Sequence, residues 1–229
     1  MPPEPAEPTT RSNAVFDQLR ADLLAGRLTP GSKLKLAVLG RRCTASLSVV
    51  REALSRLAEQ GLVVAHPQRG FSVVALSPED LADLTATRID LETLAARRSV
   101  ERGDLAWETA LVAAHHMLAG TPAATPEGEV NEEWITAHRA FHEALIAGCG
   151  SRRLQGMTSA LRDSAELYRI WSESLTHDHA RDIAGEHSTL LSLAIGRDAD
   201  GLADALAAHI QQTTDVLLRY AAHTGTGGA

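Results

Sequence analysis

Cysteines, aromatic residues and long apolar runs are scarce in this sequence. Two cysteines among 229 residues are too few for a disulfide framework and are not spaced as a metal-binding knuckle, so we expect a reducing compartment, the cytoplasm. The chain has no run of about eighteen apolar residues and no charged-then-apolar amino terminus, so we expect neither a membrane span nor a secretory signal. With 3% aromatic residues and many alanines and leucines, the composition favours a mostly α fold.

Negative charge predominates overall but is unevenly distributed. The formal net charge of −7 would by itself argue against a nucleic-acid partner. Residues 11–76, however, contain ten Arg or Lys and four Asp or Glu, a net charge of +6. Residues 77–229 contain twelve Arg or Lys and twenty-three Asp or Glu, a net charge of −11. A basic segment followed by an acidic one is expected when one half of a protein binds phosphate and the other does not.

The segment from Ser46 to Gly70 has the pattern of a helix followed by a hairpin. On a helix over residues 46–60, one side is apolar (Val50, Ala53, Leu54, Leu57) and the other polar (Ser48, Arg51, Glu52, Ser55). Ser46 is a candidate N-cap and Gly61 a candidate C-terminal stop. Short apolar runs at 62–65 and 71–74 flank a turn at 67–70. This predicts a winged helix-turn-helix, whose helix enters a major groove and whose hairpin tip meets the backbone or minor groove.

The same stretch resembles a known family. V-R-E-A-L-S-R-L-A-E-Q-G-L-V (50–63), P-Q-R-G-F-S-V (67–73) and L-R-A-D-L-L-A-G-R-L-T-P-G-S-K-L (19–34) are similar to the signature of GntR-family bacterial transcription regulators. The match covers residues 12–76 without a gap. Members commonly carry Arg directly after the helix-starting Ser and Pro two residues later, where this chain has Leu47 and Val49. The operator sequence therefore does not follow from that of relatives.

Arg51 is our first candidate for a base contact, because a guanidinium can bond two acceptors of guanine in the major groove. The alternative is a hydrogen bond to Ser55, four residues on, on an exposed face. Ser46 and Ser48 are candidates for phosphate or base contacts from the first helical turn.

Four further arginines and one glycine complete the predicted DNA interface. Arg41 and Arg42 fall where the supporting helix ends near DNA, and either contact phosphate or are solvated. Arg56 lies off the polar face, so we expect a backbone contact or a pair with Glu52. The hairpin tip adds Arg69 and Gly70.

Ser77-Pro78-Glu79 has the composition of a helix start, so we place a domain boundary there. The predicted organisation is a disordered tail at 1–11, a winged helix-turn-helix domain at 12–76, an all-α helical bundle at 77–223 and a disordered tail at 224–229. We expect six helices in the bundle, at about 78–102, 104–119, 130–148, 151–174, 179–196 and 199–222.

Four histidines in the helical half follow apolar patterns that would point them inward. His138 and His142 are four residues apart and therefore on one helix face, while His187 and His209 lie on the last two predicted helices. Inward groups from several helices can hold a divalent ion in a helical bundle. Spacing alone equally allows core histidines whose hydrogen bonds are made within the protein.

A-H-R-A-F-H-E-A-L-I (137–146), E-H-S-T-L-L-S-L-A-I-G-R-D (186–198) and A-D-A-L-A-A-H-I (203–210) resemble the FCD effector domain of the FadR-type GntR subfamily. The resemblance implies a divalent metal held in many members by one Asp and three His. The His positions match His142, His187 and His209, while His138 stands where those members have Asp. Four nitrogen ligands would favour Zn or Ni over Mg or Mn, and the departure leaves open a weak or absent site.

The resemblance also implies an effector pocket. Arg88 in T-R-I-D-L-E matches an arginine that points toward the pocket in the family, where a guanidinium can receive a carboxylate in bidentate fashion. The alternative is a pair with Glu92, four residues away. Tyr168 and Arg169 in L-Y-R-I-W resemble a segment that can also line the pocket.

These observations predict a dimeric repressor that is not an enzyme. Two copies would bind a palindromic double-stranded operator, and a small organic acid bound at the metal would release it. One alternative makes the helical half only a dimerisation scaffold. A second, a metallohydrolase, is disfavoured because Arg139 occupies the position of the general-base Glu in H-E-x-x-H.

Overall fold

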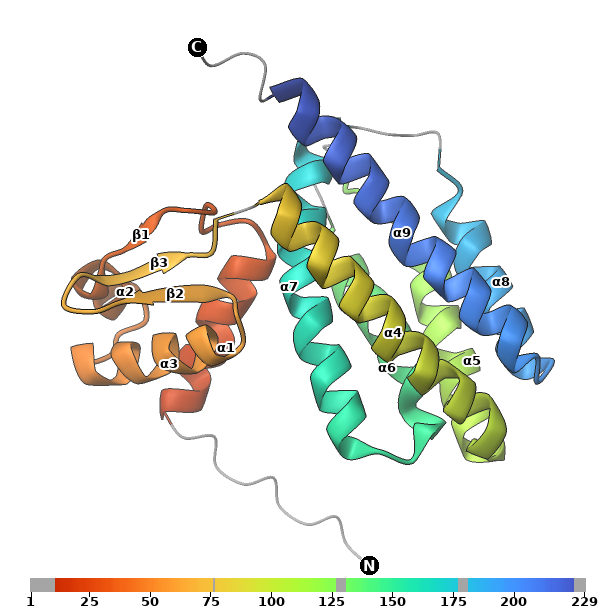
Figure 1. Ribbon diagram of the computed structural model, residues 1–229. Helices are drawn as coiled ribbons and strands as arrows, with labels where there is room; N and C mark the ends of the chain where they lie inside the picture. Colours follow the sequence, from red (N-terminus) through yellow and green to blue (C-terminus); the bar gives the residue numbers. More distant parts are fainter. Residues whose placement is uncertain (1–10, 76, 127–130, 177–180, 225–229) are drawn as a thin grey trace, which may run out of the picture. The chain divides into compact units, whose positions relative to one another are not determined.

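The computed structural model describes residues 11–75, 77–126, 131–176 and 181–224 (Figure 1). The chain divides into two compact units, Met1–Leu76 and Ser77–Ala229. The tails predicted to be disordered lie outside the described residues, except that Arg11 begins the first helix and Thr224 ends the last. Among the residues described, none of the helices has the length and apolar character that crossing a membrane requires.

The first unit is a winged helix-turn-helix. Its elements are α1 (Arg11–Leu24), β1 (Lys33–Leu34), α2 (Leu36–Arg42), α3 (Leu47–Glu59), β2 (Val63–His66) and β3 (Gly70–Val73). The sheet is antiparallel in the order β1-β3-β2, and β2 pairs with β3 in the register Val63 opposite Val73. The strands β2 and β3 and the turn between them form the predicted hairpin.

The apolar side of α3 forms the core of this unit, as its periodicity predicts. Val50, Ala53, Leu54 and Leu57 are fully buried, and α3 packs against α1. Burying each of the larger side chains contributes roughly 1.5–3 kcal/mol. The Ser46 hydroxyl accepts a hydrogen bond from the Val49 amide at 3.4 Å and so caps the helix as expected.

The chain leaves α3 through a residue with left-handed backbone. Gly61 has φ of +75°, a conformation that glycine adopts without the steric cost that a Cβ imposes. The predicted stop at Gly61 is therefore confirmed, and Leu62 turns directly into the core.

The second unit is all-helical over its described residues 77–126, 131–176 and 181–224. It contains α4 (Pro78–Arg102), α5 (Leu105–Gly120), α6 (Glu132–Ile146), a 3-10 turn (Ala147–Cys149), α7 (Arg152–Thr176), α8 (Ile183–Ile195) and α9 (Ala199–Thr224). The mostly α fold class is confirmed, and the six predicted helices differ from those observed only at their ends. Ser77 caps α4 by accepting from the Asp80 amide at 3.2 Å.

Fully buried Leu111, Phe141, Leu190 and Leu206 bring α5, α6, α8 and α9 together in one core. Helices α4 and α9 lie side by side along most of their lengths (Figure 1). Gly148 permits a close approach to α4, because a Cβ there would lie 3.0 Å from the Ser99 carbonyl oxygen. This packing fixes the positions of α6, α8 and α9, which carry the four histidines.

Candidate functional site

The polar side of α3, predicted to contact DNA, is exposed. Ser48 and Arg51 are exposed, and the Ser46 and Ser48 hydroxyls are 2.9 Å apart at the start of the helix. Within the described part of the chain, Arg51 makes no hydrogen bond or ion pair, so the alternative bond to Ser55 is absent. A guanidinium that folding does not engage keeps its donors for a ligand.

Arg42 and Arg56 have partners within the winged helix. The Asp22 carboxylate is buried and accepts from Arg42 at 2.8 Å and from Arg27 at 2.8 Å. Arg56 donates to the Asn13 side-chain oxygen at 2.9 Å and lies over the Phe16 ring at 4.2 Å. These contacts hold the helices of the domain together.

The suggested pairing of Arg56 with Glu52 is wrong, because Glu52 accepts from Ser12 instead. The remaining predicted DNA contacts lie at the surface. Arg41 is exposed at the end of α2, and Arg69 is exposed at the hairpin tip. Gly70 has φ of +92°, which a residue with a Cβ rarely adopts, so the tip depends on glycine there.

The four predicted metal ligands come together. His138 and His142 lie on α6, His187 on α8 and His209 on α9, and one nitrogen from each lies within 4.8 Å of the others. The His138 and His142 Nε2 atoms are 3.2 Å apart. His142 Nδ1 and His187 Nε2 are buried without a hydrogen-bond partner, which costs free energy unless a ligand engages them.

The cluster is held in the neutral form that binds metal. Burial lowers the pKa of His138 and His142 well below the usual range, and it lowers the pKa of His187 to about 3. Neighbouring histidines add to this because each protonated ring would repel the next. Neutral imidazoles have a free lone pair, so the donor set fits a divalent ion.

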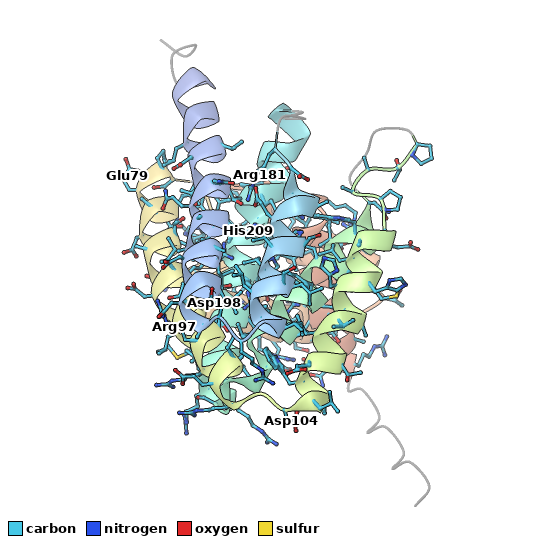
Figure 2. The ribbon with its side chains drawn as sticks, turned by 90° about the vertical axis from the view of Figure 1, so that its right-hand side faces the viewer. Glu79, Arg97, Asp104, Arg181, Asp198 and His209 are labelled. Carbon is cyan, nitrogen blue, oxygen red and sulfur yellow. The ribbon has the colours of Figure 1, made fainter. Side chains whose placement is uncertain are left out.

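Glu186 and Arg181 orient His209. The His209 Nδ1 atom is 2.6 Å from a Glu186 carboxylate oxygen, which Arg181 Nη2 also contacts at 2.6 Å. Figure 2 shows Arg181 and His209 close together beside α8 and α9. Burial opposes ionisation of Glu186, but these two hydrogen bonds outweigh it and lower its pKa to about 2. A carboxylate on Nδ1 leaves Nε2 of His209 for a metal, a common outer-shell arrangement.

Arg162, which the sequence analysis did not single out, lies near the histidines. Glu92 is fully buried and accepts from Arg88 Nε at 2.8 Å and from Arg162 Nε at 2.8 Å. The predicted alternative for Arg88, a pair with Glu92, is therefore present. Arg162 and Arg169 are seven residues apart on α7, a spacing that could have indicated a shared helix face.

Tyr168 and Arg169 are both buried but have different surroundings. The Tyr168 hydroxyl donates to an Asp80 carboxylate oxygen at 2.6 Å, at the start of α4. Burial and this acceptor raise the Tyr168 pKa. Arg169 pairs with Glu166 and lies over the Trp134 ring at 4.9 Å, and Trp134 stacks on His138. Of the two, Arg169 is the one connected to the histidine cluster.

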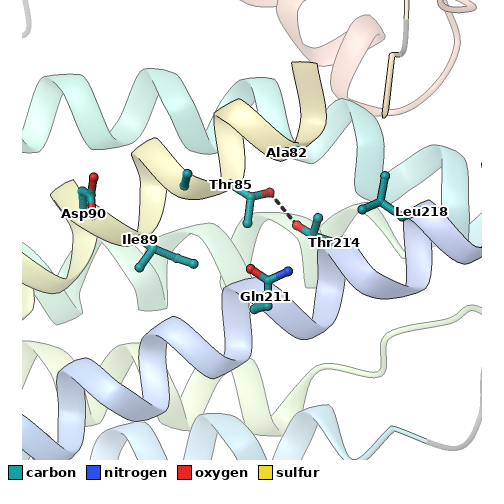
Figure 3. A pocket seen from close by; sticks show the side chains of 8 residues that line it. Ala82, Thr85, Ile89, Asp90, Gln211, Thr214 and Leu218 are labelled. Atoms are coloured by element: carbon teal, nitrogen blue, oxygen red, sulfur yellow. Dashed lines mark hydrogen bonds between the residues drawn. The ribbon is translucent and has the colours of Figure 1, made fainter. Parts of the chain in front are cut away.

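A separate groove of about 360 Å³ lies between α4 and α9 (Figure 3). Thr85 and Thr214 meet in it, their hydroxyl oxygens 2.6 Å apart. None of the predicted site residues is among those that line it.

A winged helix-turn-helix joined to an all-helical domain with an inward histidine cluster defines a class of DNA-binding regulators. Comparison with known proteins identifies the family. Residues 11–73 match the bacterial regulatory proteins of the gntR family, and residues 83–212 match the FCD domain. The chain therefore belongs to the GntR family and is a transcriptional regulator with an FCD domain, as the sequence motifs indicated. Its relatives are regulators and not enzymes, so the metallohydrolase alternative is dropped.

Two relatives align along most of this chain. The uncharacterized HTH-type transcriptional regulator BphR of Paraburkholderia xenovorans (strain LB400) is 40% identical over 90% of this chain and 85% of its own. The HTH-type transcriptional repressor GlaR of Escherichia coli (strain K12) is 31% identical over 84% and 89%. The solved structure of E. coli McbR/YncC has the same fold, with a TM-score of 0.78, 23% identity and coverage of 92% and 98%.

Proposed function

We propose that this regulator represses transcription by binding a palindromic operator as a homodimer in the cytoplasm. When a small carboxylate binds beside a divalent metal in the FCD domain, the regulator dissociates from the operator. The observation that carries this proposal is the group of four histidines from three helices, whose ligand atoms lie within 4.8 Å of one another. GlaR, which aligns with most of this chain, is named a transcriptional repressor. This supports repression over activation for this protein.

DNA recognition is assigned to the exposed side of α3 and to the hairpin tip. Arg51 is the base-contacting residue, with Ser46 and Ser48 on phosphate or bases, Arg41 and Arg42 on phosphate, and Arg69 and Gly70 on the backbone or minor groove. Arg56 stabilises the packing of α3 against α1 through its contacts with Asn13 and Phe16. Two copies of α3 place these contacts in successive major grooves, which requires the dimer.

His138, His142, His187 and His209 would hold the metal. One nitrogen from each ring lies within 4.8 Å of the others, so small ring movements would let all four share one ion. With four nitrogen ligands, Zn or Ni is favoured. When bound, the ion supplies a Lewis-acidic position for a carboxylate oxygen. Arg88 and Arg169 flank the cluster and supply the positive charge that attracts the acid.

Effector binding lowers operator affinity only if it favours one arrangement of the two DNA-binding units over another. The test is the variant that carries His138→Ala and His142→Ala, compared with His116→Ala on the exposed part of α5. We expect the double variant to bind operator DNA normally and to lose carboxylate-induced release, while the control keeps both. Full release in the double variant would contradict the proposed mechanism. Insensitivity of the unaltered protein to both chelators and organic acids would favour the scaffold alternative.

A further inference from the structure

The buried ion group formed by Arg88, Glu92 and Arg162 contains two guanidinium groups and one carboxylate. Glu92 is fully buried, and Arg88 and Arg162 are 14% and 10% exposed. Two guanidinium groups therefore share a single carboxylate inside the helical domain. Nearby, Asp163 and Glu143 share Arg139, and Glu166 pairs with Arg169. A buried charge without a counter-charge is costly, so this group is suited to an anionic ligand.

Arg162 has the donors that such a ligand would use. Its Nε donates to Glu92, but both terminal nitrogens, Nη1 and Nη2, are buried without a hydrogen-bond partner. A guanidinium presents these two nitrogens as a fork that matches the two oxygens of a carboxylate. Arg88 differs from Arg162 in that its terminal nitrogens are not among the buried atoms that lack a partner.

Arg162 also lies on the part of α7 that packs beside the histidines. Its neighbour Asp163 pairs with Arg139, which lies between His138 and His142 on α6. Arg169, seven residues further along α7, lies over Trp134, which stacks on His138. A divalent ion on four neutral imidazoles would add two positive charges and no negative ligand. His138 stands where many FCD domains have an aspartate, so this site has one negative charge fewer than theirs.

We propose that the effector is a dicarboxylate, with one carboxylate at the metal and the second gripped by Nη1 and Nη2 of Arg162. This inference rests on the proposed function, because it concerns the ligand of the same site. A dianion neutralises more of the buried positive charge than a monocarboxylate does, and it satisfies the partnerless atoms of Arg162. Arg162 is thereby the residue that selects the second acidic group.

The first test needs no variant. Unbranched α,ω-dicarboxylates of three to six carbons are titrated by calorimetry into the full-length, zinc-loaded protein, each beside its monomethyl ester. The ester keeps the length and one carboxylate but loses the second charge. We expect the best diacid to bind at least about tenfold more tightly than its ester. Equal binding of diacid and ester would overturn the inference while leaving a carboxylate-responsive regulator intact, whereas binding of neither would contradict both proposals.

The second test assigns the selectivity to Arg162. Arg162→Lys keeps a cation beside Glu92 but loses the two-nitrogen fork, and Arg153→Lys makes the same change at an exposed position of the same helix. We expect Arg162→Lys to bring the diacid affinity within about twofold of the ester affinity, with zinc affinity unchanged, and Arg153→Lys to match the unaltered protein. Preserved discrimination in Arg162→Lys would overturn the assignment.

Discussion

Polar and charged side chains of the winged helix lie mostly at the surface, whereas the helical domain buries many of its own. Among residues 11–75 the buried polar side chains are Asp22 and Ser72, and Arg51 faces solvent. The described part of the helical domain instead buries Glu92, Asp163 and Arg169 together with His142, His187 and His209. The difference suits the ligands that we propose, because DNA phosphate is met at a surface, while a small anion is enclosed and desolvated.

Acidification should affect the helical domain most, because its buried histidines act together. In the metal-free protein, unfolded histidines take up protons below about pH 6.5, whereas buried His187, whose pKa burial lowers to about 3, stays neutral. The free energy of unfolding is therefore highest above pH 6.5 and falls as the pH drops, by up to about 1.4 kcal/mol per pH unit for each buried histidine. Denaturant unfolding from pH 7 to 4 measures this slope, and His187→Gln should reduce it. A constant value over that range would contradict the burial of neutral rings.

Removing the central carboxylate of the ion group tests the buried charge itself. Glu92→Gln leaves two buried guanidinium groups without a counter-charge, so we expect the free energy of unfolding to fall by about 3–5 kcal/mol. Glu101→Gln, at an exposed position of the same helix, should change it by less than about 0.5 kcal/mol. Equal effects of the two substitutions in denaturant unfolding would show that the buried group contributes nothing.

These contrasts also show how far the sequence leads. Periodicity and end signals such as Ser46, Gly61 and Ser77-Pro78 predict the helices, because local patterns determine them. The resemblance to the FCD domain indicates which four of the ten histidines are candidate metal ligands. Arg162 was not predicted as a site residue, because its partner Glu92 is 70 residues away and local sequence patterns do not indicate such contacts. The Arg56 bond to Asn13, across 43 residues, was missed for the same reason.

Two arginines of α3 should separate DNA recognition from domain stability. Arg51→Ala removes the proposed base contact, so we expect operator affinity to fall by about 1–3 kcal/mol and discrimination to relax at one base pair. Arg56→Ala loses the bond to Asn13 and the contact with Phe16, and should lower the unfolding temperature without changing which bases are preferred. Binding to a set of single-base operator variants measures both. Unchanged discrimination in Arg51→Ala would reject it as a base contact.

The smallest expected effect concerns Leu47, which is 54% exposed at the start of α3. An apolar side chain there can contact the methyl group of a thymine, whereas an arginine would bond guanine. We expect Leu47→Arg to shift the preferred base at one operator position by about 1 kcal/mol toward guanine. Selection from randomised operators with both proteins checks this, and identical selected sequences would show that Leu47 does not contact a base.

The most direct test of the account is release of operator DNA by an organic acid before and after chelation. Fluorescence anisotropy follows labelled DNA from immediately upstream of the protein's own gene, while a panel of mono- and dicarboxylates is titrated into the preformed complex. We expect one acid to release the DNA and chelation to abolish that release without weakening DNA binding. Tight operator binding that no acid disturbs, with or without metal, would contradict the coupling between the two domains.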